Sequence, residues 1–305
     1  MNAKIILTAV LTTALIALNA GTALGADPDP GNYRSITSGN WEAASTWEVE
    51  DSGSPGTYIT AVDYPRTGDS ANVRNGHTVG VTAAVNVATL DVDGGGTVNT
   101  STNTLKIENA SGLNIDASGM LDVSDAGVLQ LDGGGTHTNA GTIELSISNS
   151  RLNITSSSAT ISGTDGIIDG VHNSAKVQVA ADLTLTVAFG QSITGRMELH
   201  GLSGGSALGK FDIDGIVDAN VASETMKFAA GTFEGSGTIK ATNSDSIVQF
   251  ASGGTYTGLA TNFVLSGGGD FDVDENVSST GGFTTFASGS KIEIAAQKSF
   301  KVYQP

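Results

Sequence analysis

The stretch LKIENASGLNIDASGMLDVSDAGVLQL, residues 105–131, repeats a pair of apolar residues, separated by one residue, at every eighth position. The pairs are Leu105/Ile107, Leu113/Ile115, Leu121/Val123 and Leu129/Leu131. Residues two apart lie on the same face of a β-strand, so each pair predicts a short strand with one buried face. The Asn, Asp, Ser and Gly residues between the pairs are typical of turns. The pattern excludes an amphipathic helix, because its apolar residues lack the i, i+3, i+4 spacing.

Three of these units, from Leu105 to Leu129, make one coil with a period that is typical of solenoids. If each unit forms one side of the coil, Leu129 returns above Leu105 one rung higher, with neighbouring strands about 4.8 Å apart. This spacing predicts an all-β fold of the right-handed parallel β-helix type. An antiparallel sandwich or barrel of short strands is the alternative, but it would not need stacked periods of this length.

The C-terminal half repeats on a similar scale. Its apolar pairs recur at nearly constant intervals, as Met226/Phe228, Val248/Phe250, Phe271/Val273 and Ile292/Ile294. A phrase also recurs, as FAAGTF from Phe228, FASGGTY from Phe250 and FASGSKI from Phe286, and each copy predicts a strand end, a glycine turn and a new strand. We therefore expect one rung per repeat, with Phe228 and Phe250 in one inward column.

The composition limits the possible functions. The chain has 305 residues, 41 of them Gly, no Cys and a net charge of −17. An acidic chain offers no counter-charge to a phosphate backbone, so we expect no nucleic-acid partner. Without cysteines, stability must come from burial and hydrogen bonding.

The segment 1–25 predicts a secretory signal peptide. Lys4 gives a positive start, residues 5–18 are an apolar run, and Ala23 and Gly25 are small residues at the −3 and −1 positions of a cleavage site. The apolar run is shorter than the roughly 20 residues of a membrane span, which disfavours a transmembrane anchor. We expect a secreted or cell-surface product that begins at Ala26 and has no membrane span after cleavage.

The segment before the repeats carries both tryptophans and resembles a known family. The motifs, within SGNWEAASTW and YPRTGDSANVRNGHTVGV, are Asn40-Trp41, Ser45-Thr46-Trp47, Pro65, Gly68-Asp69, Val73 and Gly76-His77-Thr78-Val79. They resemble the opening of the G-eight domain and of related bacterial cell-surface, pectin-lyase-like β-helix proteins, from Ser38 to Val81. The stretch EDSGSPGTYITAVD, 50–63, is longer and more acidic than that family's link. The resemblance implies an N-terminal cap over 26–83 that covers the open sheet edges, followed by β-helix coils over 84–305.

Catalytic signals are sparse, because the four histidines have no pairing spacing and the HExxH motif does not occur. Many parallel β-helices degrade polysaccharides, so a polysaccharide lyase or glycoside hydrolase is the enzymatic alternative, with carboxylates beside a basic residue or calcium. The candidate catalytic residues in the coils are Arg151, Arg196, Asp165, Asp169, Asp212 and Asp214. A shared fold supports this enzymatic alternative only by analogy, because one fold hosts many functions.

Two further groups are candidate binding residues. Trp41 and Trp47 predict either a lid over the first coil or a platform on which sugars stack. In DFDVDEN, residues 270–276, Asp270, Asp272 and Asp274 are expected on one strand face and could bind calcium, which prefers several oxygen ligands. The competing interpretation is a solvated outer face, because the stretch lacks the glycine and distal glutamate of an EF-hand loop.

These observations favour a non-catalytic structural or adhesive protein of the cell surface or extracellular matrix. It would be a rod of about ten coils, about 50 Å long at 4.8 Å per rung. A carbohydrate-binding module is the further alternative. The expected partners are extracellular polysaccharide or cell-surface and matrix components. The stretch KIEIAAQKSFKVYQP, 291–305, continues the eight-residue spacing without an evident polar cap. This pattern predicts either that a partner covers the last coil, for example by end-to-end self-association, or that the chain is a piece of a longer protein.

Overall fold

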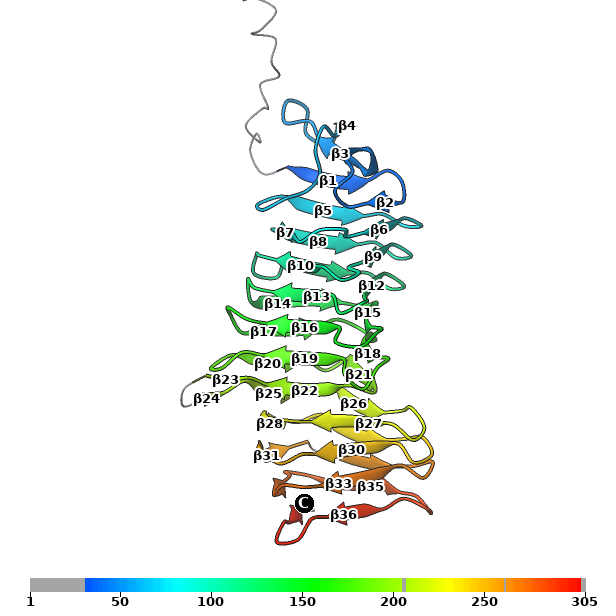
Figure 1. The fold of residues 1–305 in the computed structure, drawn as a ribbon, viewed down its shortest axis with the longest axis vertical. Coiled ribbons are helices and arrows are strands. Elements are labelled where there is room, and N and C mark those ends of the chain that lie inside the picture. The colour runs from blue at the N-terminus through cyan, green and yellow to red at the C-terminus, as the bar shows by residue number, and fades with distance from the viewer. Residues whose placement is uncertain (1–30, 205–206, 261, 303–305) are drawn as a thin grey trace, which may run out of the picture.

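Three long sheets wind around one axis in the computed structural model, which describes residues 31–204, 207–260 and 262–302 (Figure 1). Sheet A has 14 strands, sheet B has 11 and sheet C has 10. All strand pairs in sheets B and C are parallel, and the ten strands of sheet C correspond to about ten turns. The predicted parallel β-helix is confirmed, whereas the predicted signal peptide, 1–25, lies outside the described residues.

The strands follow one another in the order C, A, B in every full turn. Sheet C contains β7 (Val85–Val87), β10 (Thr104–Ile107), β13 (Val128–Leu131), β16 (Arg151–Ile154), β19 (Lys176–Val179), β22 (Glu198–Gly201), β27 (Thr225–Phe228), β30 (Ile247–Phe250), β33 (Asp270–Val273) and β36 (Ile292–Ile294). Sheet A contains β1 (Asn32–Ser35), β3 (Trp47–Glu50), β4 (Tyr58–Thr60), β5 (Ser70–Val73), β8 (Thr89–Val92), β11 (Leu113–Ile115), β14 (Gly135–Asn139), β17 (Ala159–Ser162), β20 (Thr184–Val187), β25 (Lys210–Ile213), β28 (Gly231–Gly235), β31 (Gly254–Leu259), β34 (Val277–Ser278) and β37 (Phe300–Lys301). Sheet B contains β2 (Gly39–Asn40), β6 (Thr78–Gly80), β9 (Thr97–Asn99), β12 (Met120–Val123), β15 (Thr142–Leu145), β18 (Gly166–Gly170), β21 (Gln191–Gly195), β26 (Ile216–Ala219), β29 (Thr238–Ala241), β32 (Asn262–Leu265) and β35 (Gly282–Phe286).

The four apolar pairs of residues 105–131 form four consecutive strands, β10, β11, β12 and β13. Leu105 pairs with Leu129 in register, which places both in one inward column as predicted. Phe228 pairs with Phe250 in the same way further along sheet C. The alternation of apolar and polar residues thus determines which side chains enter the core.

The core runs without a break along the axis, and its composition changes toward the C-terminus. Val, Leu and Ile fill most of the core of the first turns, while later turns carry stacked aromatic rings. Phe211, Phe233 and Tyr256 stack on successive rungs of sheet A, with ring centroids 5.0 and 5.3 Å apart. These side chains are almost completely buried, so each adds a large apolar area to the core.

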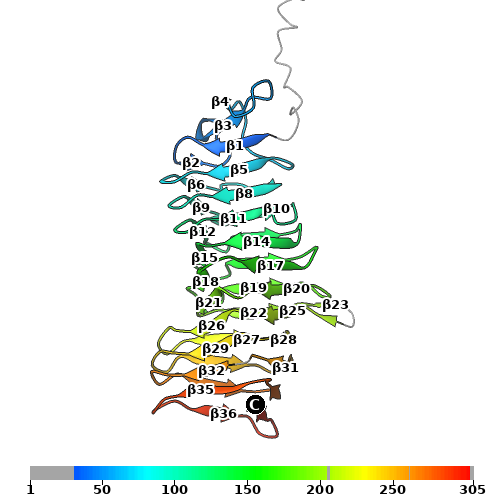
Figure 2. The same ribbon diagram turned by 180° about the vertical axis from the view of Figure 1, so that it is seen from behind.

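The N-terminal segment joins the solenoid directly. β1 pairs with β5, and β2 with β6, in the parallel sense, while β3 and β4 extend sheet A in the antiparallel sense. The 3-10 helix η1 (Ala44–Thr46) is the one helix among the described residues, and no described helix is long and apolar enough to cross a membrane. Both ribbon views place β3 and β4 at the N-terminal end of the rod (Figures 1 and 2).

Two local features differ from the predicted regularity. The turn that joins Leu199 to its partner Phe228 is longer than its neighbours, because the antiparallel hairpin of β23 (Ser203–Gly204) and β24 (Ala207–Leu208) is inserted in it. FASGSKI is not equivalent to the other two phrases. Phe286 ends a strand of sheet B, whereas Phe228 and Phe250 end strands of sheet C, because the same strand and turn chemistry fits more than one corner.

Candidate functional site

The predicted catalytic residues do not converge on one place. Arg151 lies on sheet C and Asp212 on sheet A, so these two residues belong to different faces of the rod. The remaining four form two pairs. Asp169 and Arg196 line a hollow over sheet B, and Asp165 and Asp214 line a groove along the corner between sheets A and B.

Arg151 and Asp212 lie in surroundings that do not suit the predicted roles. Arg151 is opposite Lys176 on the next rung, and its Nε atom is buried without a hydrogen-bond partner. Asp212 faces Glu234 on the next rung. Burial, followed by the charges of Asp214 and Glu234, raises the pKa of Asp212.

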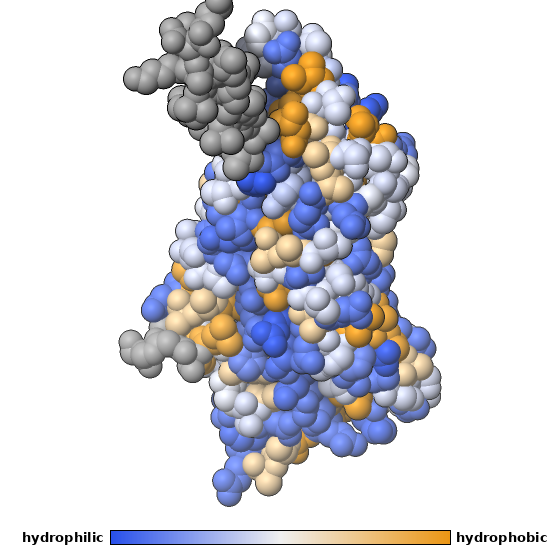
Figure 3. All heavy atoms as spheres, turned by 45° about the horizontal axis from the view of Figure 1, so that its top comes forward, coloured by the Kyte–Doolittle hydropathy of each residue, from blue (hydrophilic) through white to orange (hydrophobic). Residues whose placement is uncertain are grey.

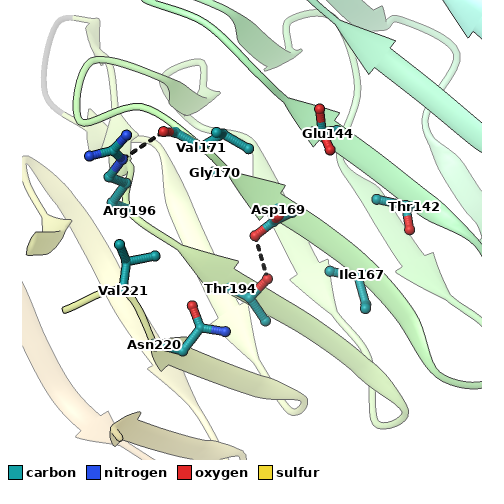
Figure 4. A pocket seen from close by; sticks show the side chains of 10 residues that line it. All are labelled: Thr142, Glu144, Ile167, Asp169, Gly170, Val171, Thr194, Arg196, Asn220 and Val221. Carbon is teal, nitrogen blue, oxygen red and sulfur yellow. Dashed lines mark hydrogen bonds between the residues drawn. The ribbon is translucent and has the colours of Figure 1, made fainter. Parts of the chain in front are cut away.

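The hollow over sheet B has a volume of about 600 Å³ and is lined by residues from four successive rungs (Figure 4). Asp169 accepts a hydrogen bond of 2.7 Å from the Thr194 hydroxyl. Arg196 turns toward the Val171 carbonyl, to which its Nε donates at 2.6 Å, and it forms an ion pair with Glu224. The guanidinium charge is therefore already compensated within the protein.

Carboxylates form a column beside this hollow, because Asp122, Glu144 and Asp169 are aligned in register on β12, β15 and β18. Burial, and then the charges of Asp122 and Asp169, raise the pKa of Glu144. A raised pKa is one of the features that general acids in active sites share, so Glu144 is the candidate general acid of this hollow. The sequence pattern missed Glu144, since its outward position between Ile143 and Leu145 resembles that of any solvated strand residue.

The groove at the corner between sheets A and B has a volume of about 480 Å³. Successive turns of the solenoid contribute its walls, with Asp165 in one turn, Phe189 in the next and Asp214 in the one after. Asp214 accepts hydrogen bonds from the backbone N–H and the hydroxyl of Ser236, at 3.0 and 2.6 Å, which lower its pKa. Phe189 is 89% exposed.

Phe189 was also missed by the sequence pattern. It continues the alternation of Leu185 and Val187, both fully buried, and would be expected in the core. The chain instead turns the corner at residues 188–190, where Gly190 has a φ of 89° and the N–H of Gln191 bonds to the carbonyl of Ala188. The corner therefore directs the ring of Phe189 into solvent.

The tryptophans are not exposed. Trp41 and Trp47 are completely buried and pack edge to face with ring centroids 4.9 Å apart. Their indole N–H groups donate to the carbonyls of Pro65 and Trp41, at 3.0 and 2.7 Å. Neither ring offers a face to a sugar, so the structure contradicts the interpretation of these two residues as a stacking platform.

The acidic stretch around β33 makes hydrogen bonds and an ion pair within the protein. Asp270 is only 8% exposed and forms an ion pair with Lys291, with an N–O distance of 3.1 Å. Asp272 and Asp274 both accept hydrogen bonds from the Gln249 amide. No group of three or more His, Asp or Glu among the described residues is arranged to hold a metal ion, so the geometry gives the calcium interpretation no support.

The histidines are dispersed along the rod. Within the described residues their hydrogen-bond partners include Ser35 for His77, the Leu113 N–H for His137, Ser174 for His172 and Glu198 for His200. Comparison of the chain with protein-family models, curated proteins and solved structures gives no match. The resemblance to the G-eight domain and to pectin-lyase-like proteins therefore stays a prediction.

Proposed function

We propose that this protein is a stiff extracellular rod with a structural and adhesive role. The observation that carries the proposal is the uninterrupted core, in which inward side chains from Val87 to Val273 are fully or almost fully buried. Each turn of a solenoid contacts its neighbours, so stiffness along the axis follows from continuous ladders of hydrogen bonds. Secretion is the part of the proposal that depends on the predicted signal peptide.

The outer surface suits many weak polar contacts. Thr136, Thr160 and Thr186 lie in register on the outer face of sheet A. The side shown in Figure 3 is mainly hydrophilic, with apolar residues in small groups. A surface of this kind favours hydrated partners such as extracellular polysaccharide or matrix components over an apolar docking partner.

The two ends of the rod differ, which supports association through the C-terminal end. The N-terminal end carries β3, β4 and the buried Trp41 and Trp47, and we propose that this segment acts as a cap. At the other end β35, β36 and β37 are the edge strands of the three sheets. Phe286 and Ile294 there are 53% and 47% exposed, while their partners one rung earlier, Leu265 and Val273, are fully buried. Open edges with apolar side chains favour pairing with a second copy.

Small-angle X-ray scattering on the chain from Ala26 to Pro305 tests the rod. We expect the profile of one elongated rigid particle, and light scattering should show a dimer that becomes monomeric in Ile294→Lys. A flexible or globular scattering profile would contradict the rod. A monomeric wild-type protein would contradict only the end-to-end association and would leave the rod proposal standing.

A polysaccharide lyase or hydrolase is the second candidate, and the raised pKa of Glu144 beside Asp169 and Arg196 is the observation that favours it. An assay for unsaturated or reducing ends on uronic-acid polymers, with and without calcium, tests it. The rod proposal expects no product. Product that disappears in both Glu144→Gln and Arg196→Ala would replace the rod proposal by the enzyme.

A further inference from the structure

We propose that the groove at the corner between sheets A and B binds a neutral polysaccharide chain lying along the rod. The inference rests on the proposed function, because it names the ligand of an adhesive rod. It is carried by the juxtaposition of Phe189, Asp165 and Asp214 from three successive turns.

The ring of Phe189 gives the groove an aromatic surface. The side chain is 89% exposed, and no ring contact among the described residues involves it. Leaving an aromatic ring in water is unfavourable, so the position invites a ligand that covers it. The face of an aromatic ring carries negative partial charge, and the C–H groups on the apolar face of a pyranose pack well against it.

Hydrogen-bonding groups lie on both sides of the ring. Asp165 precedes it by one turn and Asp214 follows it by one turn, and Ser192 and Thr238 also line the groove. Ionised carboxylates accept hydrogen bonds from hydroxyl groups, and these charge-assisted bonds are stronger than neutral ones. The combination of one apolar surface with several flanking acceptors matches a polyhydroxylated ring.

The charge of the groove selects among polysaccharides. Its lining contains Asp165 and Asp214 but neither lysine nor arginine, and the whole chain carries a net charge of −17. Uronic-acid polymers and other polyanions would be repelled. A neutral chain satisfies the carboxylates through its hydroxyl groups without this cost.

The shape of the groove fits an extended polymer. Its lining residues come from five successive turns, from Gly163 to Asn262, and therefore follow the axis of the rod. Neighbouring rungs are about 4.8 Å apart, so five rungs span roughly 20 Å, enough for several sugar units.

Retention of the purified chain on insoluble cellulose, mannan and β-1,3-glucan tests the inference. We expect retention on at least one of these polymers. Phe189→Ala should reduce retention at least tenfold, Phe189→Trp should preserve it, and the double variant Asp165→Asn/Asp214→Asn should weaken it. Because Phe189 is exposed, its replacement should leave the circular dichroism spectrum and melting temperature unchanged.

Ile147→Ala is the matched control, since Ile147 is 42% exposed at a different corner and should not affect retention. Equal retention of the wild type and Phe189→Ala would overturn the inference. So would the absence of retention on any neutral polymer, or retention confined to cationic chitosan and lost at high salt. The scattering profile does not depend on any of these binding results. A failure of the proposed polysaccharide site can therefore be distinguished from a failure of the proposed rod.

Discussion

His137 should make the stability of the rod depend on pH. Its imidazole points into the core from β14 and is completely buried. Nδ1 accepts a hydrogen bond of 3.2 Å from the N–H of Leu113, while Nε2 is buried without a hydrogen-bond partner. Burial lowers the pKa of His137 from 6.5 to about 4, because a charged imidazolium would lose its hydration in the core.

The sign of the effect follows from proton binding. Below pH 6.5 the unfolded chain takes up a proton at His137, but the folded chain does so only near pH 4, so the free energy of unfolding falls as the pH decreases between these values. At 1.36 kcal/mol per pKa unit, the difference from 6.5 to about 4 corresponds to about 3 kcal/mol. The contribution is fully present above pH 6.5 and lost below pH 4.

Urea unfolding at pH 7.5, 6.5, 5.5 and 4.5 measures this contribution. His137→Gln cannot take up this proton, so its free energy of unfolding should fall by about 2.5 kcal/mol less than that of the wild type between pH 7.5 and 4.5. Carboxylates contribute equally to both proteins and cancel in the comparison. His172→Gln is the control, because His172 bonds to Ser174 at a turn and should keep the wild-type dependence. Identical dependence in the wild type and His137→Gln would refute the reasoning.

Three further outcomes are expected. Leu121→Asp should unfold the middle of the rod, since an unpaired carboxylate in the core costs several kcal/mol. Met120→Asp, on the outer face of the same strand, should retain the wild-type circular dichroism spectrum. Equal effects of the two substitutions would contradict the assignment of Leu121 to the inner face and Met120 to the outer face. Tyr256→Phe should lower the free energy of unfolding by about 1–3 kcal/mol, because backbone carbonyls at 2.7 and 2.8 Å lose their donor; an unchanged urea midpoint would argue against these bonds. Millimolar calcium or chelator should leave the melting temperature unchanged, since Asp270 already pairs with Lys291, whereas a rise with calcium would indicate a site.

The sequence alone was enough to predict the strands and their stacking. Residues two apart lie on one strand face, and the eight-residue spacing from Leu105 to Leu129 contains both the strand and its turn. This information is local, so it predicted the register of Leu105 with Leu129 and of Phe228 with Phe250. The predicted strand end, glycine turn and new strand also occur at Phe286, but at a different corner of the coil, because the local pattern does not say which corner it forms.

Exposure at the corners was decided only by the tertiary structure. The sequence favoured Trp41 and Trp47 as a lid and left a sugar platform as the alternative, and only packing against the first turns shows that both are buried. Phe189 continues a buried alternation in the sequence, yet the turn at Gly190 directs it outward. The alternation of apolar and polar residues predicts whether a side chain is buried or exposed only within a strand. Beyond the strand end, a turn that is one residue longer or shorter moves the following side chains to the opposite face.

The grouping of the candidate residues also required the tertiary structure. Asp165, Phe189 and Asp214 are far apart in the sequence but lie on neighbouring turns of one groove. The length of a turn varies along the rod, being shorter between the partners Val85 and Leu105 than between the partners Leu199 and Phe228. The sequence determined that the chain forms coils. One complete turn advances the rod by only about 4.8 Å, so outward side chains one turn apart in the chain lie next to each other. Which residues these are depends on the number of residues in each turn, and only the tertiary structure shows that number.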